Sequence, residues 1–164
     1  MEIIRDINDF KQMKNSALTI GSYDGIHIGH RKILSSLVDY SRKKNIPAVL
    51  ITFNPHPRYV INNDNKLSLL MSMEEKIRII KELGIDYIYI IHFTKQFSLT
   101  TAKNFLDDIV LFYFNPESIF VGYNHHFGKN REGNKEFLDG FCTNRKITLK
   151  VVKPACHKEN EISS

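Results

Sequence analysis

Histidine is the residue type in this sequence that is best placed to do chemistry. The chain contains seven, and five of them lie in three short stretches punctuated by glycine or proline. Residues 21–30 read GSYDGIHIGH, residues 52–57 read TFNPHP, and residues 121–134 read VGYNHHFGKNREGN. Imidazoles can donate hydrogen bonds, accept them or bind a metal. These three stretches are therefore the candidates for a functional site.

The first stretch combines glycines with two histidines that are three residues apart. Gly21 and Gly25 permit a tight turn and a close approach of the backbone to a ligand. A helix is predicted to begin after them, and the free N–H groups at a helix N-terminus favour phosphate. His27 and His30 would lie on one face of that helix and donate to phosphoryl oxygens. A zinc site is the alternative, but it needs at least three ligands, and the sequence has neither HExxH nor a cysteine cluster.

The other two stretches carry less specific signals. Two prolines stiffen the turn that holds His56, although a plain turn is the alternative interpretation. Residues 122–129 look like a P-loop, but the spacing is one residue too long and Asn130 stands where Ser or Thr is needed, so we reject that motif. For His125 and His126 the alternative is a pair of solvated loop residues.

Helices and strands are predicted to alternate along the chain. Strand-like apolar runs occur at 17–20, 47–53, 87–91, 118–121 and 147–152, and helical apolar spacing occurs at 31–44, 72–84, 101–112 and 134–145. Apolar strands separated by helices predict an α/β fold with a parallel sheet covered on both faces. Ligands bind such sheets beyond the carboxyl ends of the strands. The three stretches follow the first, second and fourth strands, so their histidines should meet at that edge.

Length and composition favour a single soluble globular domain. The 164 residues are 42% apolar and 25% charged, which excludes disordered and fibrous chains. The net charge of +5 favours anionic ligands, but Lys and Arg are dispersed, which favours small phosphorylated molecules over nucleic acid. No apolar run is long enough for a membrane span or a signal peptide. Cys142 and Cys156 are widely spaced, which indicates reduced thiols and a cytoplasmic protein; the oligomeric state stays open.

The three stretches together resemble a known family. The first resembles the signature of the HxGH nucleotidyltransferase superfamily, with Tyr23 where Phe is usual. The second and third resemble segments of bacterial FAD synthetases, the bifunctional riboflavin kinase/FMN adenylyltransferases. Asn54 replaces a usual Glu, His125 a usual Phe, and His126 a usual Arg. The resemblance runs from about Ala17 to the end of the chain. It implies a Rossmann-like nucleotidyltransferase fold with about five parallel strands.

The resemblance also implies a domain organisation. Residues 1–164 would form the N-terminal FMN adenylyltransferase domain, without the riboflavin kinase domain that follows in the family. The last residues, Ile162-Ser163-Ser164, resemble the beginning of a segment that continues Thr-Arg-Ile-Arg in the family. The sequence would then be cut before an arginine that helps to hold the ATP phosphates.

The reaction implied by the resemblance is FAD synthesis from ATP and FMN with release of pyrophosphate. His27 and His30 would be the catalytic pair that holds the phosphates. Residues implied for ATP binding are Gly21, Ser22, Tyr23, Asp24, Gly29, Ser163 and Ser164, and those for flavin or phosphate binding are Asn54, His56, Asn124 and Arg131. Mg²⁺ would bridge the phosphates with few protein ligands, of which Asn124 is the only candidate.

Two alternatives to this function stay open. Another HxGH cytidylyltransferase or adenylyltransferase would share the first stretch but not the second and third. The second alternative is a fragment that binds ATP and flavin without turnover, because the arginine that follows Ser164 in the family is missing from this sequence.

Overall fold

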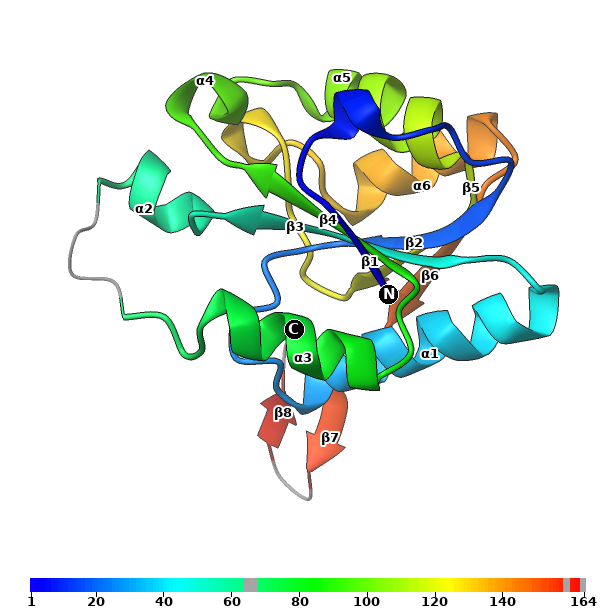
Figure 1. Ribbon diagram of the computed structural model, residues 1–164, viewed down its shortest axis with the longest axis horizontal. Coiled ribbons are helices and arrows are strands. Elements are labelled where there is room, and N and C mark those ends of the chain that lie inside the picture. Colours follow the sequence, from blue (N-terminus) through cyan, green and yellow to red (C-terminus); the bar gives the residue numbers. More distant parts are fainter. Residues whose placement is uncertain (64–67, 158–159, 163–164) are drawn as a thin grey trace.

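A parallel sheet of six strands forms the centre of the protein, with helices on both of its faces (Figure 1). The computed structural model describes residues 1–63, 68–157 and 160–162. The strand order is β1-β4-β3-β2-β5-β6, and all neighbouring pairs are parallel. The strands are β1 (Glu2–Ile4), β2 (Ser16–Ile20), β3 (Ala48–Asn54), β4 (Tyr87–His92), β5 (Pro116–Gly122) and β6 (Thr148–Val152). A separate antiparallel hairpin consists of β7 (Ala155–His157) and β8 (Asn160–Ile162).

Two sets of helices cover the sheet. Figure 1 places α1 (Ile28–Lys44) and α3 (Met73–Glu82) below the sheet, and α4, α5 and α6 above it. The helices of the second set are α4 (Lys95–Ser98), α5 (Ala102–Phe105), η2 (Leu106–Phe114) and α6 (Lys135–Asn144). The short helices η1 (Ile7–Asp9), α2 (Pro57–Ile61) and η3 (Lys129–Arg131) lie in connections. The predicted α/β fold is therefore confirmed.

The buried apolar residues divide into one cluster on each face of the sheet. Leu34 and Leu37 of α1 and Ile80 of α3 belong to one cluster, and Leu106 of η2 and Leu138 of α6 belong to the other. All five side chains are fully buried. Because successive strand residues point to opposite faces, an uninterrupted apolar strand supplies both clusters at once.

The short helices η1, α2, α4 and η3 and the β7–β8 hairpin were not predicted from the sequence. Two larger differences concern the sheet and one of its covering helices. The sheet has a sixth strand, β1, which pairs with β4 at the edge. The helix expected at 101–112 is a single α-helical turn, α5, followed by the π-helix η2, which extends to Phe114. Leu106, Val110 and Phe114 are its buried residues. They are four residues apart, a spacing that places side chains on one face of an α-helix as well as of a π-helix.

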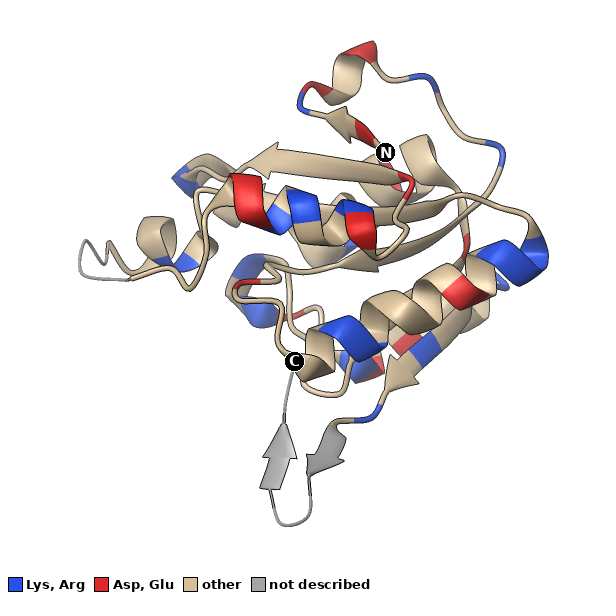
Figure 2. Cartoon of the chain, turned by 60° about the horizontal axis from the view of Figure 1, so that its bottom comes forward, with Lys and Arg blue, Asp and Glu red and all other residues tan. Residues whose placement is uncertain are grey.

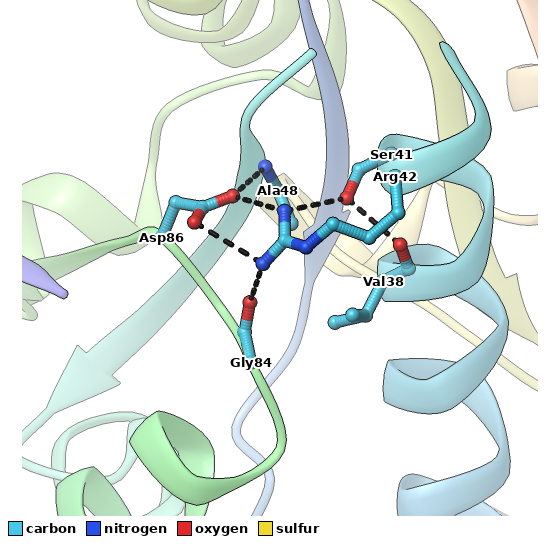
Figure 3. Close-up of polar contacts among 6 residues, drawn as sticks. All are labelled: Val38, Ser41, Arg42, Ala48, Gly84 and Asp86. Carbon is cyan, nitrogen blue, oxygen red and sulfur yellow. Dashed lines mark hydrogen bonds and ion pairs between the residues drawn. The ribbon is translucent and has the colours of Figure 1, made fainter. Parts of the chain in front are cut away.

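The amino ends of β3 and β4 are held together by a polar cluster at the end of α1 (Figure 3). The Asp86 carboxylate accepts hydrogen bonds from both terminal nitrogens of Arg42, at 2.9 and 3.2 Å. It also accepts from the backbone N–H of Ala48, at 2.8 Å. Arg42 donates in addition to the Gly84 carbonyl, at 2.6 Å. The last turn of α1, which carries Arg42, Lys43 and Lys44, is thereby bound to the amino ends of the strands, opposite the candidate site.

Charged residues are intermixed rather than gathered on one side. Figure 2 shows Lys and Arg alternating with Asp and Glu along the helices on the face in view. No helix in the part of the chain that the structure describes is long and apolar enough to cross a membrane.

Candidate active site

A cleft of about 640 Å³ opens at the carboxyl edge of the sheet. It lies where the strand order reverses, between β2 and β5, as expected for ligand sites in parallel sheets. The loops after β2, β3 and β5 line it, so the three histidine-bearing stretches do meet. The predicted site residues that line the cleft are Gly21, Ser22, Tyr23, Asp24, His27, His30, His56, Asn124 and Arg131.

Four predicted site residues are placed elsewhere or are not described. Gly29 is buried in the first turn of α1. Asn54 is exposed at the end of β3, before the cis peptide bond to Pro55. Neither residue lines the cleft. Ser163 and Ser164 lie outside the described residues.

His27 is the N-cap of α1 rather than a residue on its face. Its Nδ1 accepts hydrogen bonds from the backbone N–H groups of Gly29, at 3.1 Å, and His30, at 3.4 Å. Two of the amides that the sequence suggested as a phosphate site are therefore already paired in this structure. Accepting at Nδ1 places the proton of the neutral ring on Nε2. The part of His27 that remains to contact a ligand is thus an Nε2–H donor.

His30 stacks on His27, and its neutral ring also carries the proton on Nε2, for a different reason. The ring centroids are 3.7 Å apart and the planes are 20° from parallel. The Nδ1 of His30 is shielded from solvent and has no hydrogen-bond partner among the described residues. A buried lone pair costs less than a buried unpaired N–H, so the proton belongs on Nε2 here as well.

Both rings are held in the neutral form. Burial lowers the pKa of His27. Burial, with the neighbouring His27 and Lys76, lowers the pKa of His30 to about 4. At neutral pH the pair therefore presents two adjacent neutral N–H donors, which suits oxygens that carry negative charge.

The loop that precedes His27 has a strained backbone that side chains from other elements hold in place. Tyr23 and Ile26 have φ values of 51° and 37°, which cost on the order of 1–3 kcal/mol each for such side chains. The Tyr23 ring is buried, and its hydroxyl lies 2.6 Å from Thr19 Oγ1 on β2. The Asp24 carboxylate accepts from the Leu70 amide at 3.1 Å. These contacts fix the loop before any ligand is present.

His56 caps the short helix α2 in the same way that His27 caps α1. Its Nδ1 accepts from the Arg58 amide at 3.2 Å. Burial is the main cause that lowers the pKa of His56. Arg58 also lines the cleft, and our sequence reasoning missed it. Its position directly after the double-proline turn was the available signal.

The third loop brings a second group of polar residues to the cleft. His126 Nδ1 lies 2.8 Å from the Asn124 carbonyl oxygen and 3.2 Å from a terminal nitrogen of Arg131. A carbonyl only accepts and a guanidinium only donates, so the two contacts need different tautomers of His126. His125 is half-buried, with its Nε2 shielded and unpartnered among the described residues. Burial and the neighbouring His126 lower its pKa to about 4.

One wall of the cleft is aromatic, which the sequence analysis did not anticipate. Ring centroids follow one another at 5.5 to 6.4 Å along this row, which consists of Phe53, Phe93, Phe97, Phe105 and Phe127. Such a surface suits a flat conjugated ring. The signal in the sequence was the presence of phenylalanines at or just after the ends of two strands, at 53 and 93.

Hydrogen bonds join the start of α5, next to this wall, to the third loop. The Glu132 carboxylate accepts from the Ala102 amide at 2.7 Å, and the Lys129 amide donates to the Thr100 carbonyl at 2.9 Å. Gly128 has a φ of 76°, and a Cβ at this position would lie 2.8 Å from the Ala102 nitrogen. Only glycine fits this close approach without strain.

The described residues hold no cluster of three or more His, Cys, Asp or Glu side chains that could bind a metal ion. In the sequence analysis zinc was only an alternative to phosphate binding for the first stretch. An Mg²⁺ ion needs fewer protein ligands because it keeps several waters and binds substrate phosphates.

Comparison with known proteins agrees with this geometry. The family model for FAD synthetase matches residues 9–164. The bifunctional riboflavin kinase/FMN adenylyltransferase of Buchnera aphidicola subsp. Schizaphis graminum is 38% identical over 150 residues, which are 90% of this chain and 48% of that protein. The Escherichia coli K12 protein of the same description is 35% identical over 82% of this chain and 44% of its own length. The chain thus spans about half the length of these relatives.

Solved structures extend the comparison to the fold. One described as a macrolide-efflux protein from Streptococcus pneumoniae superposes with a TM-score of 0.81 and 25% identity, over 99% of this chain and 52% of that one. Pantothenate synthetase from Thermus thermophilus gives a TM-score of 0.56 at 11% identity, over 97% and 63% of the two chains, a likeness of fold alone. The family match over nearly the whole chain is decisive, and the chain belongs to the FAD synthetase family.

Proposed function

We propose that this chain transfers the adenylyl group of ATP to FMN, which yields FAD and pyrophosphate. The observation that supports this most directly is the stacked histidine pair, which offers two neutral N–H donors to the same cleft. The names of the relatives support the choice of FMN as acceptor. Because this chain spans about half of those proteins, their kinase activity is not part of the proposal.

The chemistry requires positioning and charge stabilisation rather than a protein nucleophile. An oxygen of the FMN phosphate forms a bond to the α-phosphorus of ATP, and the bond from that phosphorus to the bridging oxygen of pyrophosphate breaks. The second pKa of a phosphate monoester is about 6, so the attacking oxygen is already deprotonated at neutral pH and needs no base. His27 and His30 would donate to phosphate oxygens on which charge develops.

The remaining cleft residues suit the two substrates. The apolar aromatic wall would contact the benzenoid part of the FMN isoalloxazine ring. His56, Arg58 and Arg131 would attract its phosphate, and Asn124 would face the same group. The nucleotide would lie against Gly21, Ser22, Tyr23 and Asp24, with Gly29 acting through its bond to His27. For Asn54, Ser163 and Ser164, binding roles stay predictions from the family resemblance.

The cleft fits an Mg²⁺ ion bound together with ATP. The Asp24 carboxylate and the Asn124 amide both line it and supply oxygen ligands, the type that Mg²⁺ prefers. Bound there, the ion would neutralise charge on the phosphates. We place the reaction in the cytoplasm, with small molecules as its only substrates and no role for nucleic acid or membrane.

The experiment that tests this function measures FAD formation from ATP and FMN by the wild-type chain and by variants of the histidine pair. His27→Asn removes the imidazole donor but keeps a side chain that caps helices well. We expect His27→Asn and His30→Ala to lower kcat by on the order of 100-fold each. His92→Ala, at an exposed position that does not line the cleft, is the control and should match the wild type.

A panel of substrates separates the alternatives. Turnover of CTP, or of another phosphorylated acceptor in place of FMN, would assign the chain to a different HxGH reaction. Binding of ATP and FMN without pyrophosphate release would identify a non-catalytic fragment. Unchanged FAD formation in both histidine variants would overturn the assigned roles.

A further inference from the structure

Lys76 is a buried lysine that lies behind the candidate active site without lining it. Its side chain belongs to α3 and the residue is 5% exposed. Its Nζ donates to the Ser22 carbonyl at 2.7 Å, the one hydrogen bond of this ammonium among the described residues. Burial lowers the pKa of Lys76, and the negative charge of Asp24 opposes this shift. A buried ammonium with one hydrogen bond, to a neutral carbonyl, is costly for the fold. A buried lysine that lowers stability is more readily retained where it contributes to the function of a site.

The Ser22 carbonyl is held from two elements at once. Thr52 Oγ1, on β3, donates to the same oxygen at 3.2 Å. The next residue, Tyr23, has the left-handed backbone described above. In a trans peptide the C=O and the following N–H point in opposite directions. Fixing the Ser22 carbonyl therefore also fixes the direction of the Tyr23 amide.

The Tyr23 amide is directed away from Lys76. Among the described residues no hydrogen bond to this N–H is present, whereas the Gly21 amide is paired with the Ile51 carbonyl at 3.0 Å. Ser22 and Tyr23 line the cleft, and Lys76 does not. A free backbone donor next to the histidine pair is well placed for an anionic oxygen.

We propose that Lys76 is a positioning residue for adenylyl transfer: its ammonium holds the Ser22 carbonyl and thereby aims the Tyr23 amide at the nucleotide phosphates. This inference rests on the proposed function for the identity of the ligand. Lys76 also acts on the histidine pair through its charge. Burial first, and then the charges of the stacked His27 and of Lys76, lower the pKa of His30, whose other ring neighbour is the Tyr23 phenol at 5.0 Å. The removal of the Lys76 ammonium therefore favours protonation of His30.

Lys76→Met separates this role from a structural one. Methionine is unbranched and one atom shorter than lysine, and it removes the buried charge, so we expect thermal stability to stay unchanged or to rise. At the same time kcat/KM for ATP should fall by about 10- to 100-fold, because the amide donor loses its orientation. The acid limb of the pH–rate profile should move to higher pH. Lys81→Met, an exposed position on the same helix, is the matched control and should leave stability and kinetics unchanged.

Two further variants keep the test decisive. Lys76→Arg retains a charged donor and should recover part of the loss. Thr52→Val removes the other donor to the Ser22 carbonyl and should lower kcat/KM in the same direction by a smaller factor. If Lys76→Met does not fold, wild-type kinetics in Thr52→Val overturn the proposal. If it folds, wild-type kcat/KM and an unshifted pH profile overturn it.

Failure of the proposed function has a separate signature. If the wild-type chain forms no FAD from ATP and FMN, the proposed reaction is wrong. The role of Lys76 is then judged by calorimetric binding of Mg²⁺–ATP and by NMR titration of the His30 ring. Lys76→Met should weaken ATP binding and raise the titration midpoint of His30, and no change in either measurement rules the role out.

Discussion

The hydrogen bond between Thr19 and Tyr23 gives the sharpest test of how the strained loop is held. The hydroxyl oxygens lie 2.6 Å apart, and the two residues are 0% and 4% exposed. Tyr23→Phe preserves the ring, its packing and the backbone, but leaves the Thr19 hydroxyl buried without this partner. An unsatisfied buried hydroxyl costs about 1–3 kcal/mol. We expect the free energy of unfolding to fall by that amount.

A double-mutant cycle isolates the hydrogen bond from other effects. Thr19→Val alone leaves the Tyr23 hydroxyl without its partner and should lower the free energy of unfolding by a similar amount. The double variant removes both hydroxyls and should be less destabilised than the sum of the single variants, with a coupling energy of about 1–2 kcal/mol. Denaturant titration with a constant m-value measures each free energy. Additive single effects, or a cost below about 0.5 kcal/mol for Tyr23→Phe, would refute the reasoning.

The pH dependence of stability provides an independent measurement on the same residue. Burial raises the pKa of the Tyr23 phenol well above its ordinary value of about 10. The folded state therefore holds this proton more tightly than the unfolded state does. Its contribution to stability is complete below the unfolded pKa and is lost as the pH rises above it. The alkaline decline in stability should be shallower in Tyr23→Phe than in the wild type.

Three further predictions concern other parts of the molecule. Gly128→Ala should lower the free energy of unfolding by more than about 1 kcal/mol, because Gly128 has a left-handed backbone and lies against α5. Gly140 lies in α6 with open space around it, so Gly140→Ala should raise the free energy of unfolding by about 0.5–1 kcal/mol. Thermal melts of the two variants and the wild type test both predictions. The half-buried His125 has a lowered pKa, so between pH 6.5 and 4 the folded state binds fewer protons than the unfolded state and stability falls with pH. His125→Phe should reduce this loss of stability, measured by denaturant titration at each pH. Asp86→Ala should destabilise the protein more than Arg42→Ala, because it also leaves the Ala48 amide at the start of β3 without its partner. A difference of less than about 0.5 kcal/mol between the unfolding free energies of the two variants would contradict this.

The sequence predicted those parts of the fold that follow from long apolar patterns. The buried strands and α1, α3 and α6 lie within a few residues of their expected positions. The edge strand β1 escaped prediction because it has three residues, of which only Ile4 is buried. In η2 nearly every residue is apolar, so the sequence carries no period that separates a π-helix from an α-helix.

The candidate site was predictable in its location but not in its contacts. Three loops at the ends of three strands must share one edge of a parallel sheet. That His27 would serve as an N-cap could not be foreseen, because histidine is not among the preferred capping residues. Lys76 looks like a solvent-exposed charge in a capping-box helix. Its spacing of four from the buried Ile80 was the one sign that it belongs to the inner face.

The double use of His27 restricts which residues evolution can place there. One side of the ring accepts from two backbone amides, and under the proposed function the other donates a hydrogen bond into the cleft. Ser, Thr, Asp and Asn satisfy the first demand, but an ionised Asp has no donor, and the short side chains of the other three place donor and acceptor at the same end. A neutral imidazole separates the two functions across a rigid ring. Under the proposed function, selection for the start of α1 and selection for substrate binding therefore act on two nitrogens of one ring, and a substitution that keeps only the cap, such as His27→Asn, gives up the donor in the cleft.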